Sequence, residues 1–274
     1  MKLIDNNPAE EKRRAREQWE QDPCGAESAR EHKLGTREFF DEVERRRYQE
    51  YAPWMPDVME FGRFGGARLL EIGCGMGTDL LQFARGGAVC TGLDITPRSI
   101  EISRHRFALY NMPASFVLAD GERLPFGSET FDVVYSNGVL HHTPDTAGAI
   151  EDIHRVLRHG GTAKVMLYHR NSLNYWIEII LRRGLLSGGL LRGQSAQDIM
   201  SSCVEYSDHG ARPLVKVYSR SEAHELFDSF SVVKVEIVQL TRGELRLFAP
   251  AISDTLFKRL EHRLGWNVII TAKK

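Results

Sequence analysis

Residues 69–79 read Leu-Leu-Glu-Ile-Gly-Cys-Gly-Met-Gly-Thr-Asp, an apolar run that leads into three glycines spaced two residues apart. The apolar run predicts a buried strand, and the residues from Thr78 onward predict a helix. Glycine lets the backbone approach a ligand closely, while N–H groups at the start of the helix point toward that ligand. The stretch therefore predicts a strand, a ligand-binding turn and a helix.

The spacing of these glycines argues against a dinucleotide site. A Gly-x-Gly-x-x-Gly fingerprint that starts at Gly73 needs its last glycine at position 78, where the chain has Thr78. NAD and FAD are therefore disfavoured as ligands.

Short apolar runs alternate with helical patterns on the C-terminal side of this loop, which is typical of βαβ units around a parallel sheet. Strands are expected at residues 67–72, 88–94, 114–119, 131–136, 161–168, 231–240 and 266–272. Helices are expected from residue 96, at 144–158, at 219–230 and at 250–264. Thr96-Pro97 supplies an N-cap and a first-turn proline, and Ser219 and Glu222 form a capping box. Gly160-Gly161 is expected to stop the helix that precedes the fifth strand.

The N-terminal region and one internal segment depart from this alternation. Charges of both signs with apolar residues at helical spacing predict helices at 10–20 and 36–50. We expect an N-terminal helical cover at 1–65 and one sheet domain at 66–274, in which an insertion at 170–218 forms a substrate lid.

Composition excludes several classes of protein. The chain has 274 residues and a net charge of -1, which disfavours a broad nucleic-acid interface. Four scattered cysteines without a Cys-x-x-Cys pair indicate reduced thiols and no metal site. The charged N-terminus lacks the apolar core of a signal peptide, and residues 173–191 are too polar for a membrane span. We therefore expect a cytoplasmic protein without a metal or a transmembrane segment.

Polar side chains follow three further strands. Asp94 ends the second strand, Asp120 follows the third, and Asn137 follows the fourth. The carboxyl ends of parallel strands share one sheet edge, where open α/β folds bind ligands, and an acid such as Asp94 can accept both hydroxyl hydrogens of a ribose.

In these motifs, the sequence resembles the class I S-adenosylmethionine-dependent methyltransferases, especially the small-molecule branch related to quinone-biosynthesis methyltransferases. The resemblance rests on Leu-Glu-Ile-Gly-Cys-Gly-Met-Gly-Thr, Gly-Leu-Asp-Ile-Thr, Ala-Asp-Gly-Glu-Arg-Leu-Pro-Phe, Phe-Asp-Val-Val-Tyr-Ser-Asn-Gly-Val-Leu-His-His and Arg-Val-Leu-Arg-His-Gly-Gly. It implies a Rossmann-like α/β fold with a seven-stranded sheet of order 3-2-1-4-5-7-6, strand 7 antiparallel, and helices on both faces.

The resemblance also implies roles for individual residues around S-adenosylmethionine. Glu71, Gly73, Cys74 and Gly75 would line the methionine part, and Gly77 would allow close packing of the following helix. Asp94 would hold the ribose hydroxyls with Ile95 against the adenine; Asp120 and Gly121 would contact the adenine edge; Asn137 and Val139 would face the reaction centre. Gly121 departs from the larger residue of many relatives, which puts the adenine packing in question.

Methyl transfer from a sulfonium is an in-line displacement with a good leaving group, so positioning and water exclusion dominate. An acceptor with a weak nucleophile would also need a base. His141 and His142 directly follow the fourth strand and are the candidate bases, with a structural role open for both. Substrate contacts are expected from Tyr51, His169, Tyr206 and His209, with burial or a solvated loop as the alternative.

The amphipathic stretch from Tyr175 to Arg183 has several readings. It could admit a hydrophobic acceptor such as a quinone precursor, or rest on a membrane surface through Trp176 and the arginines. It could equally pack over the sheet edge or form a dimer contact. The sequence is therefore compatible with a monomer and with a homodimer.

The sequence thus predicts methyl transfer from S-adenosylmethionine to a small organic acceptor, with S-adenosylhomocysteine as product. A non-catalytic cofactor-binding or regulatory protein is the alternative from another class. An RNA methyltransferase is disfavoured, because the chain has no Asn-Pro-Pro-Tyr-type loop after the fourth strand and no basic module.

Overall fold

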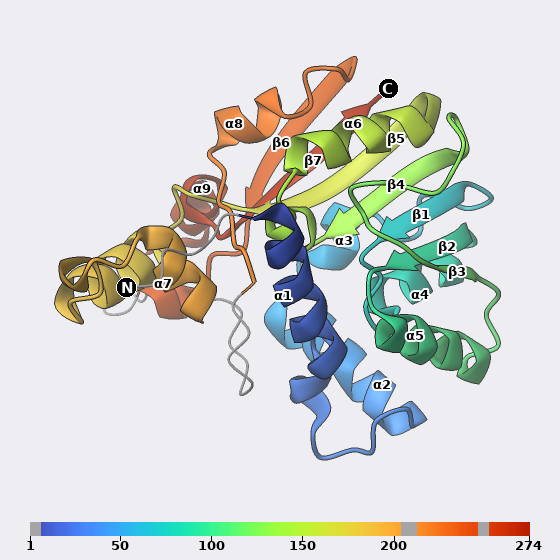
Figure 1. The fold of residues 1–274 in the computed structure, drawn as a ribbon, viewed down its shortest axis with the longest axis horizontal. Coiled ribbons are helices and arrows are strands. Elements are labelled where there is room, and N and C mark those ends of the chain that lie inside the picture. The colour runs from blue at the N-terminus through green and yellow to red at the C-terminus, as the bar shows by residue number, and fades with distance from the viewer. Residues whose placement is uncertain (1–6, 204–212, 246–251) are drawn as a thin grey trace.

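The computed structural model describes residues 7–203, 213–245 and 252–274, which are arranged around one sheet (Figure 1). Its strands are β1 (Arg68–Ile72), β2 (Val89–Asp94), β3 (Ser115–Leu118), β4 (Phe131–Asn137), β5 (Leu157–Tyr168), β6 (Val232–Val238) and β7 (Asn267–Lys273). Their order is β3-β2-β1-β4-β5-β7-β6, and β7 runs antiparallel to both of its neighbours. The predicted fold class and strand order are therefore confirmed.

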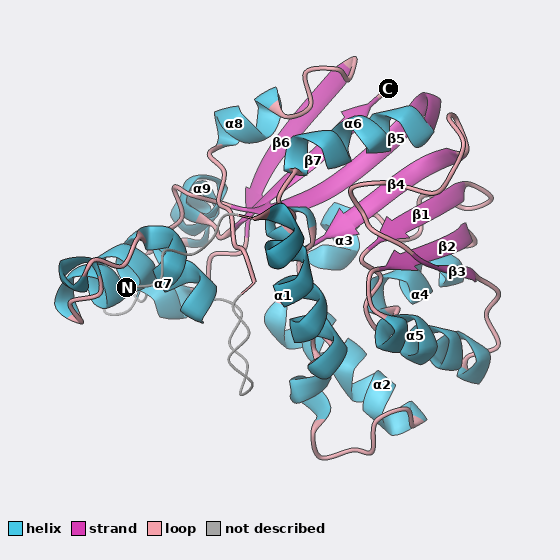
Figure 2. Ribbon diagram, viewed as in Figure 1, coloured by secondary structure: helices cyan, strands magenta, loops and turns pink. Residues whose placement is uncertain are grey.

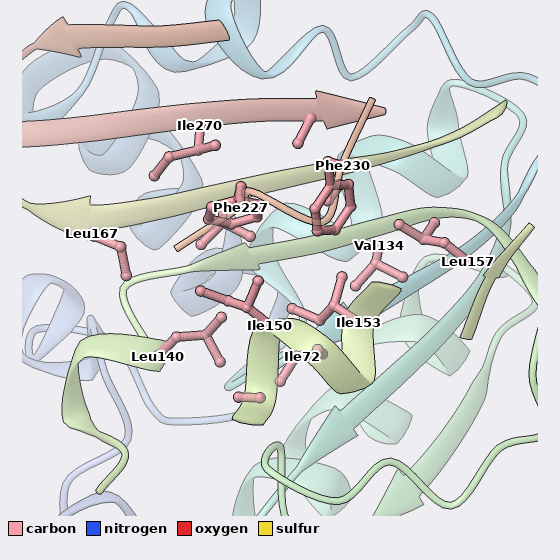
Figure 3. Close-up of a cluster of buried hydrophobic side chains, with 14 of the residues drawn as sticks. Ile72, Val134, Leu140, Ile150, Ile153, Leu157, Leu167, Phe227, Phe230 and Ile270 are labelled. Atoms are coloured by element: carbon pink, nitrogen blue, oxygen red, sulfur yellow. The ribbon is translucent and has the colours of Figure 1, made fainter. Parts of the chain in front are cut away.

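Helices cover both faces of this sheet (Figure 2). On one face, α6 (Thr146–Val156) and α8 (Arg220–Glu225) pack on alternate residues of the central strands. Figure 3 shows this cluster, with Ile150 and Ile153 of α6 beside Val134. On the other face lie α3 (Met55–Met59), α4 (Thr78–Arg85) and α5 (Pro97–Leu109). The period of two in the strands explains why every strand except β3 contributes to the apolar clusters on both faces.

The predicted helix starts are present. Thr96 caps α5 by accepting from the Ser99 N–H, and Ser219 and Glu222 form the capping box of α8. α8 ends at Glu225, earlier than the predicted 230, and α9 (Asp254–Leu264) begins later than the predicted 250. Ser253 caps α9 by accepting from the Leu256 N–H, which accounts for its later start.

The prediction that Gly160-Gly161 stops a helix was wrong. α6 already ends at Val156, and β5 begins at Leu157, which pairs with Phe131 of β4. The register then shifts, so that the next pair is Val133 with Thr162. The two glycines therefore lie in an irregular part of β5, where Gly160 adopts a φ of 76°.

The N-terminal region is helical over α1 (Pro8–Gln21), η1 (Ala26–Ala29), α2 (Arg37–Arg45), η2 (Arg46–Tyr51) and α3. The helix predicted at 36–50 is α-helical only to Arg45 and continues as the π-helical turn η2. α1 runs alongside the edge of the sheet where the parallel strands end (Figure 1).

The segment between β5 and α8 contains η4 (Tyr175–Leu186), η5 (Leu190–Arg192) and α7 (Ala196–Cys203). Tyr175 and Ile179 pack with Trp266 beside β7, while Trp176 and Leu186 are exposed. The face of η4 that carries Tyr175 and Ile179 therefore packs over the sheet edge, which is one of the hypotheses for this stretch. In the described parts of the chain, no helix has the length and apolar character to cross a membrane.

Candidate cofactor and acceptor site

The loop between β1 and α4 needs glycine at each of its three glycine positions. Gly73, Gly75 and Gly77 have φ values of 72°, 51° and 71°, a region that side chains disfavour. A Cβ atom on Gly73 would lie 2.3 Å from Cγ2 of Val139. A Cβ atom on Gly77 would lie 3.0 Å from the Ser103 hydroxyl oxygen, so Gly77 lets the loop pack closely on α5.

Asp94 joins the glycine loop to the end of β2. The Gly75 N–H donates to Oδ2 of Asp94 at 2.9 Å, and the backbone N–H and the hydroxyl of Thr96 both donate to Oδ1 at 2.9 Å. Burial raises the pKa of Asp94, although these hydrogen bonds oppose the rise. The carboxyl group is thus held in one orientation at the carboxyl edge of the sheet.

A cavity of about 480 Å³ opens at this edge and lies within the range of small-molecule sites. It is lined by the predicted residues Glu71, Gly73, Cys74, Gly75, Asp94, Ile95, Asp120, Gly121, Asn137, Val139, His142 and Tyr51. Gly77, His141 and His169 do not line it. Tyr206 and His209 lie outside the described residues.

Glu71 has a carboxyl oxygen that the described residues leave unpartnered. The side chain is 3% exposed, and its Oε2 has no hydrogen-bond partner there. Burial and the nearby charge of Asp79 raise the pKa of Glu71 well above its usual range. A buried acceptor in a glycine-lined cavity fits a ligand that brings an ammonium group, as the methionine part of S-adenosylmethionine does.

An ion pair between Arg47 and the buried Asp79, both of which line the cavity, joins the N-terminal region to α4. Arg47 donates from Nε and Nη2 to the two oxygens of Asp79, each at 2.7 Å, and the hydroxyls of Tyr48 and Tyr135 donate to the same carboxylate. Burial alone would raise the pKa of Asp79, but Arg47 and the two hydroxyls outweigh it and lower the pKa. No local pattern predicts this pair, because Asp79 resembles any acid in the first turn of a helix.

A second ion pair spans the cavity from α1 to the end of β3. Nζ of Lys12 lies 2.6 Å from Oδ2 of Asp120 and 2.5 Å from Oε2 of Glu122. Oδ1 of Asp120 accepts from the Glu122 N–H at 2.9 Å. The resemblance implies that Asp120 contacts adenine; in this structure its carboxylate is paired with Lys12, which sequence reasoning missed. Close to it, a Cβ atom on Gly121 would lie 2.8 Å from Ile72.

The two adjacent histidines have different surroundings. His142 faces the cavity, its Nδ1 lies 2.6 Å from the Leu214 carbonyl oxygen, and its ring meets the Trp19 ring edge-on. His141 is fully buried against Tyr168, with ring centroids 3.9 Å apart, and both of its ring nitrogens lack partners in the described structure. Burial, together with the charge of His142, lowers the pKa of His141 well below its usual range. Only His142 is therefore placed to meet a ligand.

His169 lies away from the cavity. It is buried, and its Nδ1 lies 2.9 Å from the Gly265 carbonyl oxygen. The described residues of the 170–218 insertion likewise contribute nothing to the cavity lining. In the ranges that the structure describes, no cluster of His, Cys, Asp and Glu is arranged to hold a metal ion.

The far wall of the cavity comes from residues that sequence reasoning did not select. Met166 and Tyr168 end β5, Gln239 follows β6, and Asn267 begins β7. Trp54 lines the cavity from the N-terminal region and packs on the same apolar cluster as Tyr168 and Met166. Strand β7 is antiparallel, so its first residue reaches the edge at which the parallel strands end.

Comparison with known proteins places this arrangement in a family. Residues 70–165 match the family described as "Methyltransferase domain". The chain is 41% identical over 96 residues to a sterol 4-C-methyltransferase of Caenorhabditis elegans, an alignment that covers 34% of this chain and 28% of that protein. It is 35% identical over 156 residues to a phthiotriol/phenolphthiotriol dimycocerosates methyltransferase of Mycobacterium ulcerans, covering 55% of each. The chain thus spans about half the length of these relatives or less.

Solved structures agree on the fold. An S-adenosylmethionine-dependent methyltransferase of Mesorhizobium loti superposes with a TM-score of 0.54 at 18% identity, over 82% of this chain and 99% of that one. Sheet order, glycine loop and sequence matches together show that residues 70–165 form a methyltransferase domain of the class I fold, with S-adenosylmethionine as the methyl donor.

Proposed function

We propose that the protein transfers a methyl group from S-adenosylmethionine to a small, largely apolar organic acceptor. The observation that carries this proposal is one continuous cavity with two unlike ends. Glu71 and the glycine loop form one end, and Trp54, Met166 and Tyr168 form the other. A polar cofactor and an apolar acceptor can therefore occupy the same enclosed space.

The cofactor would be held by the residues that line the first end. Glu71, Gly73 and Gly75 would hold its methionine part, Asp94 its ribose, and Ile95 and Gly121 its adenine. When bound, the cofactor supplies an activated methyl group on a sulfonium. The chain contributes position and exclusion of water, because α1 closes over the cavity through Lys12 and Trp19.

The acceptor end supports an apolar substrate. Its walls include aromatic and thioether side chains, which bind apolar surface through burial and close contact. The names of the relatives point in the same direction, since one is a sterol methyltransferase and another a phthiotriol methyltransferase.

His142 is the residue that we propose as the base for an acceptor that must lose a proton. With Nδ1–H donating to the Leu214 carbonyl, the other ring nitrogen, Nε2, is the basic one. We do not propose His141 for this role, because it does not line the cavity.

Two measurements test the proposal. Isothermal titration should detect S-adenosylhomocysteine, and Asp94→Ala should weaken its binding by roughly 1.5–3 kcal/mol, the range for hydrogen bonds to a charged group. Asp57→Ala, at an exposed carboxylate of α3, should leave the affinity unchanged. Mass spectrometry of metabolite pools incubated with protein and cofactor should then show an acceptor heavier by one methylene unit. Absence of affinity for either cofactor form contradicts the proposal, and binding without any product indicates a non-catalytic cofactor-binding protein.

A further inference from the structure

Asn267 lies where three strand ends meet. It is the first residue of β7 and pairs in register with Tyr168 of β5 and Val238 of β6. The next residue after β6 is Gln239, whose φ of 68° is unusual for a side-chain-bearing residue. Both amide side chains line the cavity.

The carboxamide of Asn267 is buried and only partly satisfied. The residue is 2% exposed, and its Nδ2 donates to Oε1 of Gln239 at 2.5 Å. Its Oδ1 has no partner among the described residues. Buried polar atoms are nearly always paired, so an unpaired carboxamide oxygen on a residue that lines a cavity indicates a position for a ligand donor.

Gln239 holds this group in place. Its backbone carbonyl accepts from the Trp266 N–H at 2.9 Å, and its own N–H donates to Glu261 at 3.2 Å. The left-handed backbone is thus fixed on both sides, which is the usual condition for local strain at a functional site. Because Nδ2 of Asn267 donates to Oε1 of Gln239, this hydrogen bond orients the Asn267 carboxamide.

The surroundings define the chemistry of the ligand group. β5, β6 and β7 contribute Met166, Tyr168, Gln239 and Asn267 to the cavity, and none of these side chains is charged. An uncharged hydroxyl can donate to a carboxamide oxygen, whereas a carboxylate or phosphate cannot donate.

We infer that Asn267, positioned by Gln239, binds an uncharged hydroxyl group on the apolar acceptor. This inference rests on the proposed function, because it assigns a subsite at the acceptor end of the same cavity. It makes the amide pair a determinant of specificity, since a site built to hydrogen-bond a hydroxyl rejects the analogue that lacks it.

The test compares 2-naphthol with naphthalene, two probes that differ by one hydroxyl, on protein saturated with S-adenosylhomocysteine. Titration of the wild-type protein should show a preference for 2-naphthol of about 5- to 10-fold, as expected for one neutral hydrogen bond. Asn267→Leu keeps a side chain of similar size without polar atoms, and should reduce the preference to less than about twofold. Asn267→Ala is the second variant and should do the same if the leucine variant fails to fold.

Asn171→Leu is the matched control, because Asn171 is exposed and lies outside the cavity. It should keep the full preference. Equal binding of both probes to the wild-type protein, no binding of either, or a preference that survives both Asn267 variants overturns the inference. Affinity for S-adenosylhomocysteine is measured on the wild-type protein and on every variant. Failure of the proposed function is then distinguishable, because the wild-type protein itself would not bind S-adenosylhomocysteine.

Discussion

The guanidinium group of Arg47 and the carboxylate of Asp79 form a two-pronged ion pair, with both hydrogen bonds 2.7 Å long. Arg47 belongs to the π-helical turn η2 of the N-terminal region, and Asp79 to the first turn of α4, directly after the glycine loop. Asp79 is 3% exposed and also accepts from two tyrosine hydroxyls. The pair therefore fixes the N-terminal region to the helix that follows the glycine loop.

Removing one member of this pair should be costly. Arg47→Met leaves the Asp79 carboxylate buried without its counter-charge, and should lower the free energy of unfolding by about 3–5 kcal/mol. The double variant Arg47→Met with Asp79→Leu removes both charges and should recover most of that loss. Urea unfolding measures both; a double variant as unstable as Arg47→Met would show that the charge is not the cause.

The ion pair also predicts how stability depends on pH. The pKa of Asp79 is lowered in the folded protein, so its stabilisation is complete above the usual aspartate pKa of about 3.9. It is lost as the pH falls through the lowered pKa. Because the charges of Asp79 and Arg47 also act on the pKa of Glu71, both proteins carry Glu71→Gln in this comparison. The difference in unfolding free energy between Glu71→Gln and the double variant in the same background should thus be constant from about pH 5 to 8 and change only below about pH 4. Urea titrations across that range check this, and a change near neutral pH would contradict it.

Gly73 should tolerate no side chain. Gly73→Ala combines about 1–2 kcal/mol of left-handed backbone strain with about 1–3 kcal/mol for displacing Val139, and should abolish binding of S-adenosylhomocysteine. Gly66→Ala is the matched control, since Gly66 has a φ of 77° but open space around it, and should show the strain alone. Adding Val139→Ala to Gly73→Ala should restore part of the stability. Equal losses for the two glycine variants in denaturant unfolding would refute the steric account.

The elements around the glycine loop could be predicted because local signals determine them. Apolar runs, glycines and the acids at strand ends give β1, β2 and β4 and most of the cofactor wall. The arginines at 45–47 show where prediction from local signals fails. They are consecutive and chemically alike, yet Arg45 and Arg46 pair with glutamates of the N-terminal region while η2 turns Arg47 inward to Asp79.

The part of the cavity wall that β5, β6 and β7 contribute depends on topology rather than on local pattern. Asn267 reads only as the start of a strand, and it reaches the cavity because β7 is antiparallel. The histidines show the same limit at shorter range: a 3₁₀ turn at Leu140–His142 directs His142 to the cavity and His141 onto Tyr168. Sequence proximity to the fourth strand does not distinguish them.

His142 should affect catalysis and leave cofactor binding intact. His142→Asn should lower kcat for a hydroxyl acceptor by about 10²- to 10⁴-fold, the range for a general base, with affinity for S-adenosylhomocysteine within about twofold. A thiol acceptor needs little help with its proton and should lose much less. His224→Asn, at an exposed residue of α8, is the control. Steady-state kinetics with both acceptor types decide the matter, and equal losses for both would assign His142 a structural role instead.

Glu71 should release a proton when the cofactor binds. Its pKa is raised in the folded protein, which is the opposite sign to Asp79: its stabilisation is present at low pH and is lost as the pH rises. An ammonium group placed against its unpartnered oxygen favours the ionised form, so binding should expel up to about one proton. Titration calorimetry with S-adenosylhomocysteine in two buffers of different ionisation enthalpy measures this number. Glu71→Gln should reduce it to nearly zero and weaken binding, whereas Glu101→Gln, on the exposed side of α5, should keep it. Identical enthalpies of binding in both buffers for the wild-type protein would mean that no proton is released, and would contradict the prediction that Glu71 is protonated before the ammonium group binds.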